Sequence, residues 1–408
     1  MTNDARATTD GVARRSYGKL MGILVAGTRD VAAAEDALSE AFAAALADWP
    51  TNGCPSNPEA WLVAVARRKA IDVARRRETG ERLATELRIL ADTPEPTGDI
   101  PDQRLALLFV CAHPALDHGV RAPMMLQVVL GLDAKAIASA FLTSPAAMGK
   151  RLVRAKEKIR RAGIPFRVPE RAELPARLGA VLDAVYAAFT EGWYDPAGTD
   201  PARRDLTSEA IFLARLVTEL LPDQPEALGL LALILHAEAR RRARRNTCGE
   251  YVPLAEQDQT RWDWDQIREA EALLLQAAAF RTIGRYQLEA ALQSAHVHRC
   301  RTGEANWADV VQLYDALLAI TDSPVVALNR AIAIGQLHGP AAALKILDSL
   351  AETGQLDGYQ SYWAARAHLL ASTGAAADAR QAYDTAIGLE RDDAVRQFLL
   401  RRRALIHD

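Results

Sequence analysis

Cysteine is scarce in this chain of 408 residues, which contains four of them at Cys54, Cys111, Cys248 and Cys300. They lie far apart in the sequence, and no two have the short spacing of a zinc or redox motif. We therefore expect neither a disulfide framework nor a metal centre. Scattered single cysteines are typical of a protein that works in the reducing cytoplasm.

Long apolar runs are also absent. No stretch is long enough to span a bilayer, and the first residues are polar, unlike those of a secretory signal peptide. These absences argue against an integral membrane protein. They predict a cytoplasmic location and no membrane partner.

The sequence carries no recognisable catalytic constellation. It contains no phosphate-binding loop, and no nucleophile stands beside a base. His296 and His298 are two residues apart, so on a helix they diverge and make a poor metal pair. Glu256, Asp258 and Arg261 could line a pocket, although we favour a structural network within their loop. We expect no enzyme, with no catalytic residue, metal ligand or cofactor.

The chain does contain many aliphatic residues in helical patterns. Half of its residues are hydrophobic and 6% are aromatic, which predicts an all-α protein of two or three domains. Residues 1–171 contain 25 Lys and Arg against 20 Asp and Glu, whereas the remainder contains 24 against 32. A basic front part and an acidic back part indicate a nucleic-acid-binding module joined to a different domain.

Residues 133–162 have the pattern of two helices separated by a tight break. Asp133 stands at the N-cap position of the first helix. After the break, Ser144 is a good N-cap and Pro145 suits the first position of a second helix that runs to about Arg161. An apolar stripe along this second helix consists of Met148, Leu152, Ala155 and Ile159.

Another face of this second helix is basic. Two short helices with a basic second member form a helix-turn-helix pattern, in which the second helix enters the major groove. Small residues at its start allow close approach, and Lys and Arg then reach phosphates and guanine edges. A solvated surface helix and a membrane-surface helix are the alternatives. The residues that we expect to contact DNA here are Ser144, Ala147, Lys150, Arg151, Arg154 and Lys158.

A strong helix is expected at residues 30–49. Its outer face carries an acidic patch of Glu35, Asp36, Ser39 and Glu40. Its inner side is expected to include Ala34, Leu38, Ala41, Phe42, Ala45, Leu46 and Trp49. The patch is either solvated or a docking surface. The proline-rich residues 50–58 are expected to interrupt the helix.

A basic helix is expected at residues 59–77, with Trp61 near its start. Its cationic residues are Arg67, Arg68, Lys69, Arg75, Arg76 and Arg77. A tryptophan beside an arginine cluster suits base stacking combined with phosphate contact. An aliphatic core helix with a soluble face is the alternative, and Trp61 then belongs to the core.

The back part of the chain is also helical, with an irregular stretch at residues 246–265. A repeat begins near residue 324, with a period of 36 residues against about 34 in tetratricopeptide repeats. Ala327, Ala331, Ile334, Ala343, Leu347 and Leu350 correspond to Trp363, Ala367, Leu370, Ala379, Tyr383 and Ala386. Gly374 is expected in the turn within the second copy. An unrelated alanine-rich bundle is the alternative.

The first 165 residues resemble a bacterial RNA polymerase sigma factor of the extracytoplasmic-function group, a sigma-70-like, sigma-24-type family. The resemblance to region 2 rests on AEDALSEAF (34–42) and WLVAVARRKAIDVARR (61–76). The resemblance to region 4 rests on GLDAKAIASAFLTSPAAMGKRLVRAKEKIR (131–160). In the second motif Trp61, Leu62, Ala66, Arg67, Ile71, Asp72 and Arg75 match the family, whereas Arg68 stands where the family often has Asn.

A subgroup of these factors carries a long C-terminal tetratricopeptide-like extension. AFTEGW (188–193), LLPDQPEALGLLAL (220–233) and EQDQTRWD (256–263) resemble it. The resemblance therefore implies region 2 at 1–80, a linker at 81–102, region 4 at 103–165 and a helical-repeat domain at 166–408.

The resemblance also implies partners and contact residues. Asp36, Glu40 and Phe42 match positions that bind the β′ clamp helices of core RNA polymerase. The β flap is a further expected partner. The expected contacts with the −10 element of promoter DNA are Trp61, Arg67, Arg68, Arg75 and Arg76. The helix from Pro145 matches the one that reads the −35 element.

The resemblance thus implies a sigma factor that directs promoter-specific initiation, with a C-terminal domain that is a regulatory unit or a scaffold for a protein or ligand. The rival is a ligand- or protein-sensing helix-turn-helix regulator that acts without core polymerase. Such a regulator would need its own dimer surface and two DNA half-sites. An enzyme in the back part is a third, weaker alternative.

Overall fold

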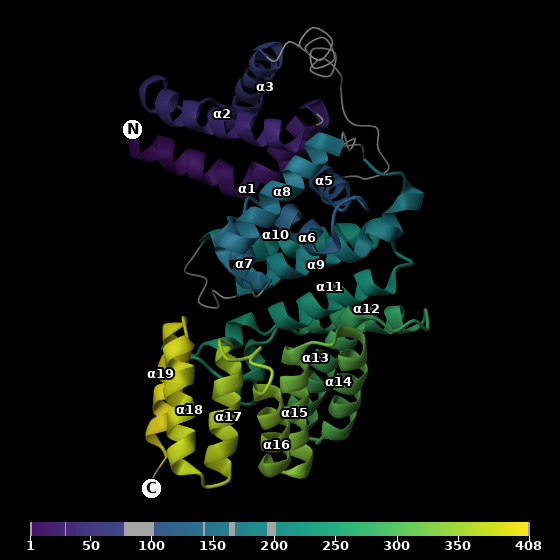
Figure 1. Ribbon diagram of the computed structural model, residues 1–408, viewed down its shortest axis with the longest axis vertical. Helices are drawn as coiled ribbons and strands as arrows, with labels where there is room; N and C mark the ends of the chain where they lie inside the picture. Colours follow the sequence, from purple (N-terminus) through teal and green to yellow (C-terminus); the bar gives the residue numbers. More distant parts are fainter. Residues whose placement is uncertain are drawn as a thin grey trace. The chain divides into compact units, whose positions relative to one another are not determined.

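A computed structural model describes residues 2–28, 30–76, 102–141, 143–162, 168–193 and 201–406. Within these ranges every regular element is a helix, apart from one β-bridge between Arg245 and Tyr251 (Figure 1). The predicted all-α class is therefore confirmed. No helix in the described ranges is long and apolar enough to cross a membrane. The helices form two compact units that meet in the sequence between Leu220 and Leu221.

The first unit begins with α1 (Thr2–Thr28), α2 (Val31–Asn52) and α3 (Pro58–Arg76), each of which packs against the other two. Asp30 starts α2 because its carboxylate accepts hydrogen bonds from the first amides of the helix. The apolar stripes of the three helices meet in a core that includes Leu20, Met21, Leu24, Leu38, Trp49 and Leu62.

The helix that we predicted to end at residue 49 extends to Asn52. Pro50 lies in its last turn, and Gly53 ends it with a φ of 86°. This φ is in the left-handed region that glycine adopts without strain. The interruption therefore spans residues 53–57, which is shorter than we predicted.

The chain continues with α5 (Gln103–Cys111), α6 (His118–Val128), α7 (Ala134–Ala140) and α8 (Pro145–Ala162). The central helix is α6, which contacts the other three. Its buried residues include Val120, Ala122, Pro123, Met124, Met125, Leu126 and Val128. Of the predicted linker at 81–102, only Asp102 lies within the described residues, and it caps α5.

Two further helices, α9 (Leu174–Trp193) and α10 (Pro201–Leu220), belong to the first unit. The buried Arg177 of α9 donates a hydrogen bond to the carbonyl oxygen of Phe109 at 3.1 Å. On α5, Arg104 forms an ion pair of 2.8 Å with Glu209 of α10. The domain boundary that we predicted at residue 166 therefore falls inside this unit, because α9 and α10 complete the core around α5 and α6.

The helix α1 packs directly against the end of α6. A Cβ atom at Gly18 would lie 2.3 Å from the carbonyl oxygen of Val129, so a larger residue would push the two helices apart. The ring of Tyr17 lies against Gly131, and burial raises the pKa of its hydroxyl. The first three helices and the group around α6 are thus in contact.

The second unit is a row of helices (Figure 1). They are α11 (Pro225–Glu238), α12 (Trp264–Ala278), α13 (Arg285–Thr302), α14 (Trp307–Thr321), α15 (Pro324–His338), α16 (Pro340–Ala351), α17 (Gln360–Ser372), α18 (Ala376–Leu389) and α19 (Asp393–Ala404). From α13 onward each helix packs against the next one, and α11 packs against both α12 and α13. Local contacts between successive helices therefore build this unit.

The predicted repeat positions lie at these helix contacts. Fully buried positions include Ala331, Ala343, Leu347, Ala367, Ala379 and Ala386. Gly374 lies in the turn between α17 and α18 with a φ of 82°, as the pattern predicted. Small residues at a helix contact let two backbones approach closely, while Tyr362 and Tyr383 fill the wider gaps.

The irregular stretch between α11 and α12 is ordered. It contains three short 3-10 helices, η2 (Arg241–Arg244), η3 (Leu254–Glu256) and η4 (Gln259–Arg261). The side-chain oxygen of Asn246 accepts hydrogen bonds from the amides of Cys248 and Glu250, both at 2.9 Å. Such local bonds replace a helical ladder and hold the loop in one shape.

Candidate nucleic-acid interface

Residues 141–144 separate α7 from α8, and the predicted Leu142 of this break lies outside the described residues. Asp133 caps α7 by accepting a hydrogen bond from the amide of Ala136 at 2.7 Å. Ser144 caps α8 by accepting one from the amide of Ala147 at 3.2 Å, and Pro145 follows as the first helical residue. The predicted stripe of Met148, Leu152, Ala155 and Ile159 is buried. It fixes which face of α8 points outward.

That outward face is basic. Lys150, Arg151, Arg154 and Lys158 are exposed, as is Ser144 at the start of the helix, whereas Ala147 is half-buried. Within the described chain, no ion pair involves Lys150, Arg151 or Arg154. A Cβ atom at Gly149 would meet nothing within 4 Å, so this part of α8 is open to an incoming surface. Lys158 lies 3.6 Å from the carboxylate of Asp117.

One cation of α8 faces inward instead. The ammonium group of Lys156 lies 2.5 Å from the carboxylate of Glu35 on α2, and both side chains are 19% exposed. We had placed Glu35 in the outer acidic patch, which is wrong for this residue. The correction follows from the packing of α8 beside α2, which brings together residues 121 positions apart.

The outer face of α2 holds the other predicted acids. Asp36 and Glu40 are exposed, and Glu40 lies 3.0 Å from Lys69 of α3. Phe42 is half-buried. Leu46, which we predicted to point inward, is 47% exposed. Because residues 36, 39, 40, 43 and 46 recur at helical spacing, Leu46 lies on the same outer face as Asp36 and Glu40.

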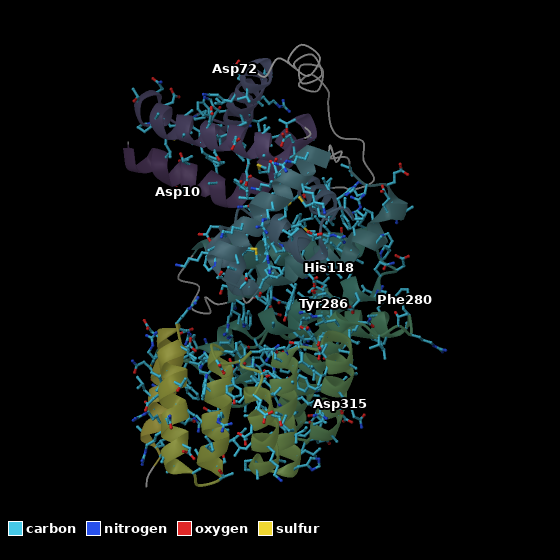
Figure 2. The ribbon with its side chains drawn as sticks, in the orientation of Figure 1. Asp10, Asp72, His118, Phe280, Tyr286 and Asp315 are labelled. Atoms are coloured by element: carbon cyan, nitrogen blue, oxygen red, sulfur yellow. The ribbon has the colours of Figure 1, made fainter. Side chains whose placement is uncertain are left out.

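The predicted residues of α3 divide between core and surface. Trp61 is half-buried and packs edge-on against Trp49, with ring centroids 5.5 Å apart. Arg68 is exposed and Arg67 is half-buried. Asp72 lies exposed near the end of α3 (Figure 2). The side chains of Arg75 and Arg76, also predicted to contact DNA, lie outside the described residues.

Two protein families match parts of this chain. The family described as sigma-70 region 2 matches residues 12–79. A second family, described as a family of unknown function (DUF6596), matches residues 177–278. An uncharacterized protein of Rhizobium meliloti (strain 1021) is 39% identical over 378 residues, which cover 90% of this chain and 89% of the relative. The chain belongs to the same family as this relative. No solved structure matches this chain.

The sigma-70 region 2 match covers α1 from residue 12 onward and all of α2 and α3, and it supports a sigma-70-family factor. Region 2 therefore includes the acidic face of α2 and the basic face of α3. Sequence reasoning found both faces from their charges. It missed Leu46, because a leucine in an amphipathic helix is normally assigned to the core.

The second match, at residues 177–278, begins in α9 and ends in α12. It therefore continues across the boundary between the two units. We had assigned residues 166–408 to one repeat domain. The matched segment is instead divided between the two units, and its first part, α9 and α10, completes the core around α5 and α6.

No group of three or more His, Cys, Asp or Glu side chains among the described residues has the arrangement of a metal site. Cys111 at the end of α5 is buried, and burial raises the pKa of its thiol to about 12. It is therefore protonated at neutral pH and acts as a small apolar residue.

Proposed function

We propose that this protein is a sigma factor of the extracytoplasmic-function group, which binds core RNA polymerase in the cytoplasm and directs promoter-specific initiation. The main observation in its favour is a sigma-70 region 2 whose α2 presents exposed Asp36, Glu40 and Leu46. The same compact unit carries the exposed basic face of α8.

In this proposal α8 reads the −35 element. Its cap places Ser144 and Pro145 at the exposed start of the helix, where small side chains allow the backbone to approach DNA. Lys150, Arg151 and Arg154 follow along the same outward face. Guanidinium groups at such positions form bidentate hydrogen bonds with guanine and also bind phosphates.

The outer face of α2 is the proposed docking site for the β′ clamp helices of core polymerase. Exposed carboxylates steer a basic partner, and the exposed Leu46 adds apolar contact area. Arg67 and Arg68 of α3 are the proposed contacts with the −10 element. Trp61 fits this role through its half-exposed edge, since its other side packs on Trp49.

The two DNA-reading helices must separate during this function. The −10 and −35 elements lie about 25 base pairs apart, which is roughly 85 Å of B-form DNA. In the structure α3 packs on α2, and α8 pairs with Glu35 of α2, a helix of 22 residues. Such a helix is about 33 Å long, so both readers lie within about one helix length of each other.

For the second unit we propose a tetratricopeptide-like scaffold. The packing of each helix from α13 to α19 against its neighbour supports this, as do the buried alanines at the contacts. The partner of such a scaffold is a regulatory protein or a ligand.

The test of the sigma-factor proposal is co-elution of the full-length protein with core RNA polymerase in gel filtration, followed by run-off transcription. We expect co-elution, and we expect the double variant Asp36→Arg, Glu40→Arg to lose it while its helical content is unchanged. Both residues are exposed, so the fold tolerates the change.

The matched control is Glu352→Arg, Asp378→Arg, which makes the same charge change at exposed positions of the second unit. It should bind core polymerase like the wild type. If the wild-type protein binds operator DNA as a dimer and does not bind core polymerase, the protein is instead a helix-turn-helix regulator.

A further inference from the structure

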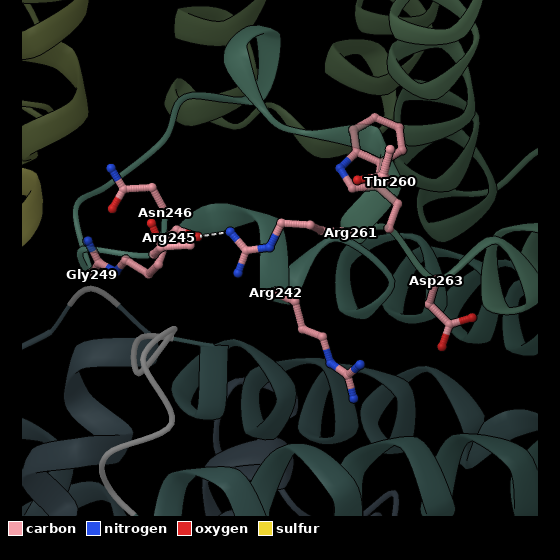
Figure 3. A pocket seen from close by; sticks show the side chains of 9 residues that line it. Arg242, Arg245, Asn246, Gly249, Thr260, Arg261 and Asp263 are labelled. Atoms are coloured by element: carbon pink, nitrogen blue, oxygen red, sulfur yellow. Dashed lines mark hydrogen bonds between the residues drawn. The ribbon is translucent and has the colours of Figure 1, made fainter.

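The second unit contains a hollow of about 690 Å³ beside η2 and η4. This volume is typical of small-molecule sites. Figure 3 shows Arg242, Arg245 and Arg261 around it, with Asn246 at one side and Asp263 at the other. Three guanidinium groups in one hollow make its lining positive, even with Asp263 present.

The buried arginine of this hollow is incompletely hydrogen-bonded. Arg245 is 9% exposed, and its Nη2 atom pairs with the carboxylate of Asp392. Its Nε and Nη1 atoms are shielded from solvent and have no hydrogen-bond partner among the described residues. The indole Nε1 of Trp262 is also buried without an acceptor. Unpaired donors of this kind are costly, most of all on a charged group.

The frame around these donors is held by its own bonds. Arg261 donates from Nη1 to the carbonyl oxygen of Arg245, as the dashed line in Figure 3 marks. Asp258 caps η4 by accepting a hydrogen bond from the amide of Thr260 at 2.9 Å. Glu256 pairs with Arg402 at 3.3 Å. Of the three residues that we considered for a pocket, only Arg261 lines it, and the two acids belong to the structural network.

We propose that this hollow binds a small molecule through a phosphate group. Phosphate oxygens accept several charge-assisted hydrogen bonds at once, which suits a hollow whose lining includes Arg245 and Arg261. The frame already fixes these donors, so binding orders few side chains. Arg242, which is exposed at the rim, attracts and contacts the anion.

The test is calorimetric titration of the full-length protein at constant ionic strength, with inorganic phosphate and ADP as phosphate probes and succinate as a carboxylate probe. We expect saturable binding of a phosphate probe and a matching rise in the Tm of the protein. The variant Arg242→Gln should weaken this binding by about tenfold or more, since one charge-assisted hydrogen bond is lost.

The matched control is Arg268→Gln, which removes an exposed arginine of α12 that does not line the hollow. It should bind phosphate like the wild type. A second variant, Arg245→Lys, keeps the positive charge beside Asp392 but removes the unpaired Nε and Nη1 donors. It should also lose binding. If it does not fold, the comparison of Arg242→Gln with Arg268→Gln decides.

Three results would overturn the proposal. The first is absence of binding of either phosphate probe up to about 10 mM. The second is binding of succinate alone, which would assign the hollow to carboxylates. The third is an equal change in Arg242→Gln and Arg268→Gln, which would indicate a non-specific effect of charge. None of these results depends on polymerase or promoter binding, so the sigma-factor proposal is tested separately.

Discussion

Arginine and lysine side chains gather along α8 in the first unit and around η2 in the second, and these two groups differ in burial. On α8, Lys150, Arg151 and Arg154 are exposed along one face of the helix. Around η2, Arg240 is 8% exposed and Arg245 is 9% exposed. An exposed row of cations can bind a large polyanion such as DNA, whereas buried guanidinium groups can bind only a small molecule that enters a hollow.

This difference in burial should also decide whether a cation contributes to the stability of the fold or to the binding of DNA. Burial lowers the pKa of Arg240 to about 10, and Arg240 is tied to its surroundings by hydrogen bonds to the carbonyl oxygen of His236 and to Gln293. On α8, Lys150, Arg151 and Arg154 form no ion pair within the described chain. Substitution of the buried Arg240 or Arg245 should therefore change the stability of the second unit, and substitution of Lys150, Arg151 or Arg154 should change DNA binding alone.

The largest effect is expected for Arg245→Met. This change leaves the carboxylate of Asp392 without its partner in a site where both side chains are mostly buried. Breaking such a pair should lower the free energy of unfolding of the second unit by about 3 kcal/mol. Urea unfolding followed by circular dichroism measures it. The matched variant Arg154→Met on α8 should stay within about 0.5 kcal/mol of the wild type. Equal losses of unfolding free energy in the two variants would show that the buried and the exposed arginine contribute equally to stability.

A pH effect of similar size is expected from His236. It is fully buried on α11, and burial together with the neighbouring Arg240 lowers its pKa to about 4, although the carboxylate of Glu271 lies 3.4 Å away. In the unfolded chain a histidine titrates near 6.5. As the pH falls below about 6.5, the unfolded state therefore takes up a proton first, and stability is lost down to about pH 4.

The free energy of unfolding should fall by at most on the order of 3 kcal/mol, because each unit of pKa difference between the folded and unfolded states corresponds to 1.36 kcal/mol. His236→Gln should flatten the dependence of the free energy of unfolding on pH between 4 and 6.5. A smaller slope should remain from His296, whose pKa burial also lowers to about 4. An unchanged slope in His236→Gln would show that this site is not dry in solution.

The sequence alone predicted the features that depend on one helix. The caps at Asp133 and Ser144 and the buried stripe of α8 follow from neighbouring residues, and the structure has them where we expected them. The all-α class and the glycine turn at Gly374 follow from the same local patterns.

The features that depend on distant contacts could not be predicted. Glu35 is half-buried in its pair with Lys156, which is 121 residues away, and Arg245 pairs with Asp392 at a separation of 147 residues. No periodicity within α2 or η2 contains this information. The assignment of α9 and α10 to the first unit likewise depends on Arg104 and Arg177, whose partners only the folded chain reveals.

A moderate effect is expected from the exposed face of α8. Replacing Lys150, Arg151 or Arg154 by Ala should lower promoter affinity by about 1–3 kcal/mol where the side chain reads a base. A side chain that binds phosphate should instead reduce the slope of log K against log salt by about one. Fluorescence anisotropy over a salt series separates the two. The exposed Arg268→Ala of the second unit is the control. Unchanged affinity and slope in all three α8 variants would exclude this face.

The smallest effect is expected for Glu35→Gln. This change tests Lys156, a cation of α8 that is paired and mostly buried, as Arg245 is. The Glu35–Lys156 pair is 19% exposed on both sides, so its loss should lower the free energy of unfolding of the first unit by about 1 kcal/mol. Because Lys156 does not belong to the outward face, Lys156→Met should leave the affinity for isolated −35 DNA unchanged, unlike Arg154→Ala. A double-mutant cycle of Glu35→Gln with Lys156→Met measures the coupling of the pair. Zero coupling, together with a loss of DNA affinity in Lys156→Met equal to that in Arg154→Ala, would show that Lys156 faces DNA and that α8 does not rest on α2 in solution.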